Sequence, residues 1–406
     1  MKNIKVLLAI ALIITSMVAC QKMLPQAPAD DEILDGPVEG LTYSQHSQFA
    51  AGDAAFNTQV FTKETGLGPY FVATSCGTCH AGDGRGHPFS TLTRFGQNDT
   101  TGNQFMLFGG PQLQNRAIPG YLAEVLPSGA PHANFTPPAN TGLGFLGALT
   151  DAQLFANADP DDLNGDGISG VPNYITPPSY FFPQPFHQSF GGKYIGRFGK
   201  KAAAIDLLHQ TVNAYNQDMG ITSVYSPDEP GCNGVLSPYA DDVPDPEIQS
   251  NSVLNVVFYL RTLKAPVQRT PNDANVLAGK QVFMNIQCAS CHKPEWTTGQ
   301  SDIAALSNKT FFPYTDLLLH DMGSDLDDGY TEGMAKTAEW KTPPLWGLGL
   351  AKYSQGGSYY LMHDGRATSI EAAILLHGGE AANSRNQYQA LNATEKQQLI
   401  KFLESL

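Results

Sequence analysis

Apolar residues along the chain gather in short runs that are separated by long polar stretches. The first run, Val6 to Ile14, is too short for a membrane span, which needs about 20 apolar residues. Farther along, the apolar spacing of residues 51–56 and 278–283 predicts short helices. Residues 369–376 also predict a helix, with a serine at its start. The pattern as a whole predicts a mainly α-helical fold with long loops and only short strand pairs.

The N-terminal segment has the order of features found in export signals. Lys2 and Lys5 precede the apolar run, and small residues follow it as far as Cys20. Residues 17–20 resemble a bacterial lipobox, although Met17 stands where leucine is usual. We expect Cys20 to be the lipidated first residue of the mature protein. The alternative is a plain secretory signal with an incidental cysteine.

This interpretation places the protein in the cell envelope. Residues 1–19 are the expected lipoprotein signal peptide, and the polar, proline-containing residues 20–40 are the expected flexible tether. The lipid anchor is then expected to hold the mature chain at the periplasmic face of a bacterial membrane.

The sequence contains the C-x-x-C-H pattern twice, which is the attachment signature of c-type haem. The spacing follows from the chemistry, because two thiols form thioethers with the vinyl groups of one porphyrin and the adjacent histidine ligates its iron. Two zinc or dithiol sites are the alternative, but both copies include the histidine. We therefore expect two covalently bound c-type haems. The residues are Cys76, Cys79 and His80 in the first copy, and Cys288, Cys291 and His292 in the second.

An internal repeat supports two related halves. A Thr-Pro-Pro sequence recurs at a comparable distance after each cysteine motif, at residues 136–138 and 342–344. Two haem domains of cytochrome c type are the simplest explanation. The apolar run 253–263 leads into a polar stretch that contains proline, where we expect the boundary. The expected domains are residues 41–265 and residues 266–406.

Composition and charge narrow the choice of partners. The 406 residues include 40 glycines and 28 prolines, which favours a fold whose site is shaped by turns and loops. The formal net charge of −14 disfavours nucleic acid, because a binding surface would have to neutralise phosphates. The charge is compatible with a basic redox partner protein, or with a small-molecule oxidant or substrate.

Several segments resemble the bacterial di-haem oxidoreductase family, often labelled thiol oxidoreductases, which is related to the di-haem cytochrome c peroxidases. The likeness runs from about Gly52 to the C-terminus, and its second half is the more specific part. It implies a peroxidase-like electron-transfer protein with one substrate-facing haem and one haem that has two histidine ligands. The matching segments are residues 66–69, 83–86, 162–170, 196–199, 313–323, 339–347, 363–366 and 377–381.

The resemblance also implies axial and catalytic residues. In the related peroxidases, a His-Asp-Gly motif is followed fourteen residues later by the distal methionine ligand of the C-terminal haem, and counting from His363 gives His377 instead of a methionine. The second haem is thus expected to have His292 and His377 as ligands. The alternative for His377 is an ordinary hydrogen bond at a helix end. His363 is expected to act as an acid or base at the first haem, or else to be a turn residue.

No sixth ligand stands out for the first haem, and an open iron position is what substrate chemistry requires. Gly147 stands where many family members have a glutamate, which argues against peroxidase activity. The candidate sixth ligands are His87, His132, His187, His209 and Met219.

Two further signals concern calcium and a lone thiol. Asp162, Asn164 and Asp166 precede a glycine in the order of the first half of a calcium loop. Asn173 stands where the closing glutamate is expected, so calcium and an Asx-rich turn are both open. Cys232 lies outside the other signals, and a lone thiol is more often inert than catalytic.

Three functions are compatible with these features of the sequence. The first is a peroxidase-like oxidoreductase with its substrate at the first haem. The second is a non-catalytic electron-transfer cytochrome. The third is a haem-bearing lipoprotein that serves metal uptake.

Overall fold

The computed structural model describes residues 29–230, 241 and 243–406. The chain divides into two units. The described part of the first unit, which ends at Ile33, contains the 3₁₀-helix η1 (Asp30–Glu32). The second unit, Leu34–Leu406, contains the elements discussed below. Cys20 and Cys232 lie outside the described residues, so lipidation and the role of the lone thiol stay predictions.

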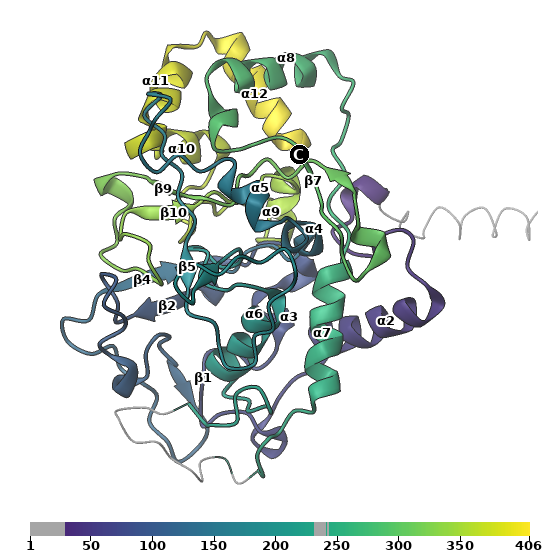
Figure 1. Ribbon diagram of the computed structural model, residues 1–406, viewed down its shortest axis with the longest axis vertical. Coiled ribbons are helices and arrows are strands. Elements are labelled where there is room, and N and C mark those ends of the chain that lie inside the picture. The colour runs from purple at the N-terminus through teal and green to yellow at the C-terminus, as the bar shows by residue number, and fades with distance from the viewer. Residues whose placement is uncertain (1–28, 231–240, 242) are drawn as a thin grey trace, which may run out of the picture. The chain divides into compact units, whose positions relative to one another are not determined.

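Helix predominates over strand, as the sequence predicted, with 35% of the residues in helices and 11% in strands (Figure 1). Among the described residues, no helix combines the length and the apolar composition that crossing a membrane requires. The α-helices are α2 (Tyr43–Asn57), α3 (Cys76–Cys79), α4 (Leu143–Gly147), α5 (Asp151–Phe155), α6 (Leu207–Asn213), α7 (Ser250–Thr262), α8 (Ala274–Asn285), α9 (Ala351–Ser354), α10 (Ile370–Leu375), α11 (Ala382–Ala390) and α12 (Ala393–Ser405).

Shorter elements connect these helices. The π-helix is η6 (Ala214–Asp218). The 3₁₀-helices are η2 (Lys63–Thr65), η3 (Ala81–Asp83), η4 (Pro88–Ser90), η5 (Met106–Phe108), η7 (Cys288–Ser290), η8 (Ala304–Leu306), η9 (Ser324–Leu326), η10 (Leu348–Leu350) and η11 (Gly379–Ala381). The strands form antiparallel pairs: β1 (Tyr70–Phe71) with β3 (Arg116–Ala117), β2 (Leu92–Phe95) with β4 (His132–Phe135), β5 (Tyr174–Ile175) with β6 (Tyr194–Ile195), β7 (Trp296–Thr297) with β8 (Thr310–Phe311), and β9 (Leu319–Asp321) with β10 (Glu339–Lys341).

Polar side chains set where the main helices begin. Thr42 and Gln45 form a reciprocal capping box at the start of α2. Asp273 and Ser369 accept hydrogen bonds from amides in the first turns of α8 and α10. The predicted segments 51–56 and 278–283 lie within α2 and α8, and the predicted segment 369–376 contains α10 and its two capping residues, so these three predictions are confirmed.

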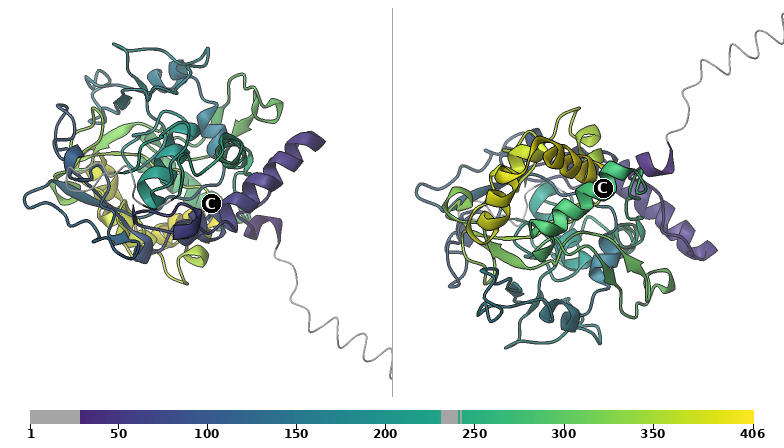
Figure 2. Two further views of the ribbon diagram at one scale, coloured as in Figure 1. Left: turned by 90° about the horizontal axis from the view of Figure 1, so that it is seen from below. Right: turned by 90° about the horizontal axis from the view of Figure 1, so that it is seen from above.

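Two helix pairs repeat the same close crossing. Helix α2 packs on α7, and α8 packs on α12 (Figures 1 and 2). Each first helix has a glycine at the crossing, Gly52 in α2 and Gly279 in α8. A Cβ atom at Gly52 would meet the carbonyl oxygen of Asn255, and one at Gly279 would meet that of Gln398. Glycine therefore lets the two backbones approach closely at both crossings.

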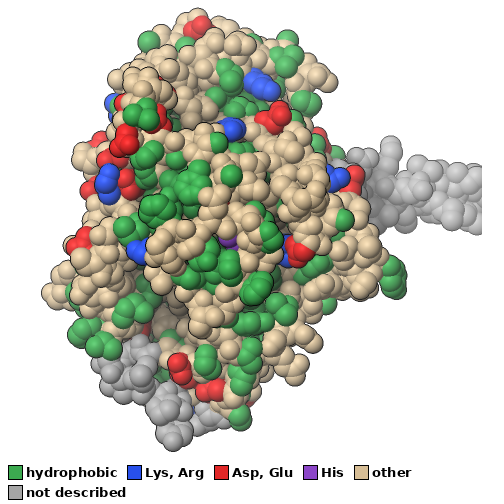
Figure 3. All heavy atoms as spheres, viewed as in Figure 1, with side chains coloured by type: hydrophobic (Ala, Val, Ile, Leu, Met, Phe, Trp, Pro, Cys, Tyr) green, Lys and Arg blue, Asp and Glu red, His purple; other side chains and the backbone are tan. Residues whose placement is uncertain are grey.

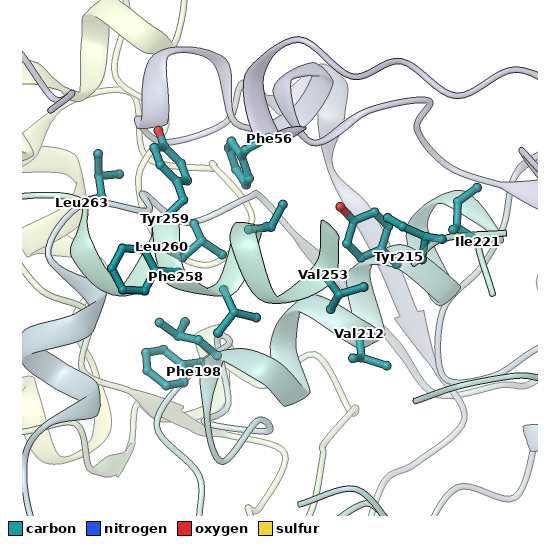
Figure 4. Packing of buried hydrophobic residues seen from close by; sticks show 14 of the residues in the cluster. Phe56, Phe198, Val212, Tyr215, Ile221, Val253, Phe258, Tyr259, Leu260 and Leu263 are labelled. Carbon is teal, nitrogen blue, oxygen red and sulfur yellow. The ribbon is translucent and has the colours of Figure 1, made fainter. Parts of the chain in front are cut away.

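Buried side chains form two main cores around these crossings. One core is built on α2, α6 and α7, and Figure 4 shows Phe56 and Tyr259 within it. The other is built on α8, α10 and α12, where the rings of Phe283 and Phe402 lie 5.4 Å apart. A smaller cluster, with Trp346 among its members, draws on both expected domains. Other apolar side chains remain at the surface and gather across the middle of the face seen in Figure 3.

Gly279→Ala is expected to lower the free energy of unfolding by roughly 1–3 kcal/mol, because the added methyl group pushes α8 away from α12. Urea unfolding followed by circular dichroism measures the change. Gly147→Ala is the matched control, since a Cβ atom there makes only an ordinary contact with Phe198. The control is expected to leave stability unchanged or to raise it by up to about 1 kcal/mol. Equal losses in the two variants would contradict the role given to the crossing.

Candidate functional site

The first cysteine motif lies on a short helix in the wall of a cavity of about 260 Å³. Ser75 begins α3 by accepting a hydrogen bond from the Thr78 amide at 3.2 Å. Cys76 and Cys79 are three residues apart in this helix, so they share one face, and both line the cavity. His80 follows at the end of the helix and lines the same cavity.

A backbone contact fixes the ring of His80. Its Nδ1 lies 3.0 Å from the carbonyl oxygen of Pro138, in the first Thr-Pro-Pro sequence. A carbonyl oxygen can only accept, so Nδ1 holds the proton and Nε2 is left as the ligand atom. Burial lowers the pKa of His80 to about 4, so the imidazole is neutral near pH 7. A neutral imidazole is the form that ligates a metal.

The second motif has the same arrangement at a second cavity, of about 200 Å³. Cys288, in η7, and Cys291 line this cavity together with His292. Nδ1 of His292 lies 3.0 Å from the carbonyl oxygen of Tyr314, and burial lowers the pKa of His292 to about 4. Each motif thus presents two thiols and one neutral imidazole to a largely apolar cavity.

His377, at the end of α10, faces His292 across the second cavity. The two ring centroids are 6.4 Å apart. Two metal–imidazole bonds of about 2.0 Å account for about 4 Å of that separation, and half the width of each ring accounts for the rest. Nδ1 of His377 lies 2.7 Å from the carbonyl oxygen of Ala373, so its Nε2 is free as well. The space between the rings therefore fits one metal ion with two imidazole ligands.

The first cavity differs from the second in its candidate sixth ligand. Among the described residues that line it, His80 is the only histidine, whereas Met219 lines it and is only 2% exposed. Met219 is thus the one candidate sixth ligand that the structure brings to this cavity. The other four candidates lie outside its described lining, and they are His87, His132, His187 and His209.

His363 lines the second cavity and is absent from the described lining of the first. Its ring stacks on Trp340 with centroids 3.7 Å apart, and its Nε2 lies 2.7 Å from Oδ2 of Asp328. Only its backbone reaches toward the first cavity, where its carbonyl oxygen accepts a hydrogen bond from the Thr136 amide at 2.8 Å. The side chain that the resemblance assigned to the first haem therefore lies beside the second cavity, because stacking and the carboxylate hold it there.

Three half-buried cations line both cavities, and the sequence analysis did not single them out. They are Arg85, Lys200 and Lys341. None of the three makes an ion pair with a carboxylate of the described chain; Arg85 donates to the carbonyl oxygen of Pro344 at 3.4 Å. Burial lowers the pKa of Arg85 to about 10, that of Lys341 to about 8, and that of Lys200 well below its usual value. Cations removed from water in this way call for an anionic partner.

A buried ion cluster supports the wall beside Cys291. Nε2 of His320 lies 2.8 Å from Oδ2 of Asp316, and its Nδ1 lies 2.7 Å from Oε2 of Glu380. Burial alone would lower the pKa of His320, but hydrogen bonds to the two carboxylates and to Cys291 raise it well above its usual value. Burial would raise the pKa of Glu380, but hydrogen bonds from His320 and Ser169 lower it to about 2. The cluster therefore holds a protonated imidazole between two carboxylates.

The loop that resembles a calcium site is exposed and is closed by its own amides. Asp162 accepts hydrogen bonds from the Gly167 amide at 3.1 and 3.2 Å, and Asn164 accepts one from the Asp166 amide at 2.8 Å. Asn173, at the position of the closing glutamate, donates instead to two backbone carbonyl oxygens in the core. Calcium at this loop stays a prediction.

Comparison with known proteins supports the haem interpretation. A family model described as "di-haem oxidoreductase, putative peroxidase" matches residues 134–406, more than half of the chain. The matched residues contain the second cysteine motif, and the first motif precedes them. A search of curated proteins found no match. Among solved structures, hydrazine synthase from Kuenenia stuttgartiensis is similar at 15% sequence identity and a TM-score of 0.39, over 95% of this chain and 98% of that one.

Replacing Glu380 with glutamine is expected to lower the free energy of unfolding by about 3 kcal/mol, because the buried cluster loses one of its two carboxylates. The matched control, Glu295→Gln, removes a carboxylate from an exposed position. It is expected to change stability by less than about 0.5 kcal/mol. Thermal unfolding of both variants measures the difference. If Glu380→Gln lost no more stability than Glu295→Gln, the role given to Glu380 in the buried cluster would be contradicted.

Proposed function

Because this chain belongs to the di-haem oxidoreductase family, we propose that it is an exported di-haem c-type cytochrome that transfers single electrons in a peroxidase-like reaction. In this proposal, each expected domain, residues 41–265 and 266–406, carries one haem. The observation that supports it most strongly is the duplicated placement of two thiols and one neutral imidazole at the wall of an apolar cavity.

The two cysteine motifs supply the proposed attachment chemistry. The thiols form thioethers, and the free Nε2 of each adjacent histidine is the proximal ligand. His377 is the proposed sixth ligand of the second haem. A bound haem supplies reversible one-electron chemistry. The attaching residues are Cys76, Cys79 and His80 for the first haem, and Cys288, Cys291 and His292 for the second.

The half-buried cations support the same proposal. A haem has two carboxylate groups at one edge of an otherwise apolar ring. Arg85, Lys200 and Lys341 face both cavities and lack carboxylate partners within the described chain. In our proposal these side chains neutralise the acidic edges of the two haems. Charge and shape are thereby both matched, since the remaining cavity walls are largely apolar.

His363, the residue expected to act as an acid or base at the first haem, lines only the second cavity, so in this proposal it tunes the surroundings of the second haem and does not act on a substrate at the first. Its Nε2 donates to Asp328, so Nδ1 is the free acceptor on the ring. Burial lowers the pKa of His363, which favours the neutral form that accepts a proton near pH 7.

A non-catalytic electron-transfer cytochrome is the second candidate function, and one observation favours it. Met219 lines the first cavity, and a methionine on that iron would close the position that a substrate needs. The optical spectrum of the oxidised protein separates the two candidates: a high-spin component supports the open first haem, and two low-spin haems support electron transfer alone. Metal uptake gains no specific support from the described residues.

Export and partners belong to the proposal as well. The order of charged and apolar residues in 1–19 supports lipid anchoring at Cys20, on the periplasmic face of a bacterial membrane. The proposed partner is a redox protein or a small-molecule oxidant, and the acidic net charge favours a basic protein.

Mature protein from a strain competent in cytochrome maturation is expected to exceed its polypeptide mass by two haems, as measured by intact mass spectrometry. The double variant Cys76→Ala, Cys79→Ala is expected to keep one haem, because the second motif is untouched. Cys232→Ala is the matched control and is expected to keep both. A wild-type protein without covalent haem would refute the proposal.

His377→Ala is expected to convert one low-spin haem to a high-spin haem, because the second iron loses an imidazole. His132→Ala is the control, since His132 is exposed and lies outside both described cavity linings. Visible absorption spectra of the oxidised proteins record the change. Identical spectra for His377→Ala and the control would remove the ligand assignment.

A further inference from the structure

We propose that Glu229, Asp241 and Glu247 form a calcium site, which lies outside both cavities and apart from the loop at residues 162–170. Each residue offers one carboxylate oxygen, and these oxygens all lie within 4.8 Å of one another. Calcium binds oxygens at 2.3–2.6 Å, so the oxygens around one ion lie within about 5 Å of one another. The three carboxylate oxygens are therefore close enough to share one calcium ion.

Two buried carboxylate oxygens of the cluster have no hydrogen-bond partner among the described residues. Glu229 is only 8% exposed, and its Oε2 has no hydrogen-bond partner among the described residues. Oε1 of Glu247 is also buried without such a partner in that part of the chain. A carboxylate oxygen removed from water without a partner is costly. A cation between these oxygens removes that cost at both residues.

The described neighbours of Glu229 and Glu247 include further carboxylates, at Asp241 and Asp245. Within the described chain, no lysine, arginine or histidine makes an ion pair with Glu229 or Glu247, and residues 231–240 contain none of these residue types. Burial, followed by repulsion from neighbouring carboxylates, raises the pKa of Glu229 to about 9. Burial also raises the pKa of Glu247 to about 7. The raised pKa values reflect this crowding of carboxylates, which a divalent cation among the three clustered oxygens would relieve.

A threonine beneath the cluster shows the same crowding. Oγ1 of the buried Thr222 lies 2.5 Å from Oδ1 of Asp245 and 2.6 Å from Oε2 of Glu247. A hydroxyl has one proton, so it can donate to only one of the two oxygens. The same Glu247 oxygen also accepts a hydrogen bond from the Thr222 amide at 2.5 Å, which holds this side chain in place at the cluster.

The site would tie together segments that are distant in sequence. The side chain of Glu247 packs where a Cβ atom of Gly66 would lie. The Gly68 amide donates to the carbonyl oxygen of Met219 at 3.0 Å, three residues before Thr222. Because Met219 lines the first cavity, a bound calcium ion would stiffen one wall of that cavity. The calcium proposal itself does not depend on what the cavity holds.

Calcium titration of the chelator-treated, full-length protein by calorimetry tests the site. The wild type is expected to bind calcium at this site. The Glu229→Gln and Glu247→Gln variants are each expected to lose calcium binding at this site, or to bind calcium there at least about tenfold more weakly. Glu39→Gln, at an exposed position, is the matched control and should bind as the wild type does.

Thermal unfolding and a variant in the loop at residues 162–170 provide two further tests of the site. In chelator, Glu229→Gln is expected to unfold at the same temperature as the wild type or at a higher one, because the repulsion between the clustered carboxylates is relieved. Added calcium should raise the unfolding temperature of the wild type but not that of Glu229→Gln. Asp162→Asn is expected to retain the response to calcium. A wild type that binds no calcium, glutamine variants that bind as well as the wild type, or a response lost in Asp162→Asn alone would overturn the proposal.

Discussion

The structure depends on two cavities that the chain does not fill with its own side chains. Their walls combine apolar surface, neutral imidazoles and the half-buried cations Arg85, Lys200 and Lys341, which no carboxylate of the described chain neutralises. Charges of this kind are costly unless an anion joins them. A flat apolar ligand with acidic groups at one edge and a metal at its centre satisfies all three requirements together. The cavity walls therefore match the charge and shape of that ligand.

The two halves share their helix crossings but differ in the backbone carbonyl groups that orient the histidines of the cysteine motifs. The glycine crossings of α2 with α7 and of α8 with α12 are equivalent, and each lies close to its cysteine motif. The carbonyl groups that orient the proximal histidines are not equivalent. Pro138 lies in the Thr-Pro-Pro repeat, whereas Tyr314 lies well before the second copy of that repeat. The recurring Thr-Pro-Pro sequence therefore does not mark the same contact in the two halves.

Local signals were predictable from the sequence, and contacts between distant residues were not. The helices α2, α8 and α10 follow from short-range spacing and capping, and the cysteine motifs follow from a five-residue pattern. The structure brought His377 to His292, as the resemblance implied, but it placed His363 at the other cavity. The sequence did not show that Lys200 lacks a carboxylate partner in the described chain or that His320 pairs with buried carboxylates, because a sequence does not show which charges meet after folding.

The hydrogen bonds that join the two expected domains have a consequence for folding. Ser169, from residues 41–265, donates to Glu380 in residues 266–406, and Thr136 donates to the carbonyl oxygen of His363. Expressing either stretch alone would leave these acceptors without their donors. Unfolding of one stretch is therefore expected to weaken the other, so that the two lose their structure in one cooperative transition.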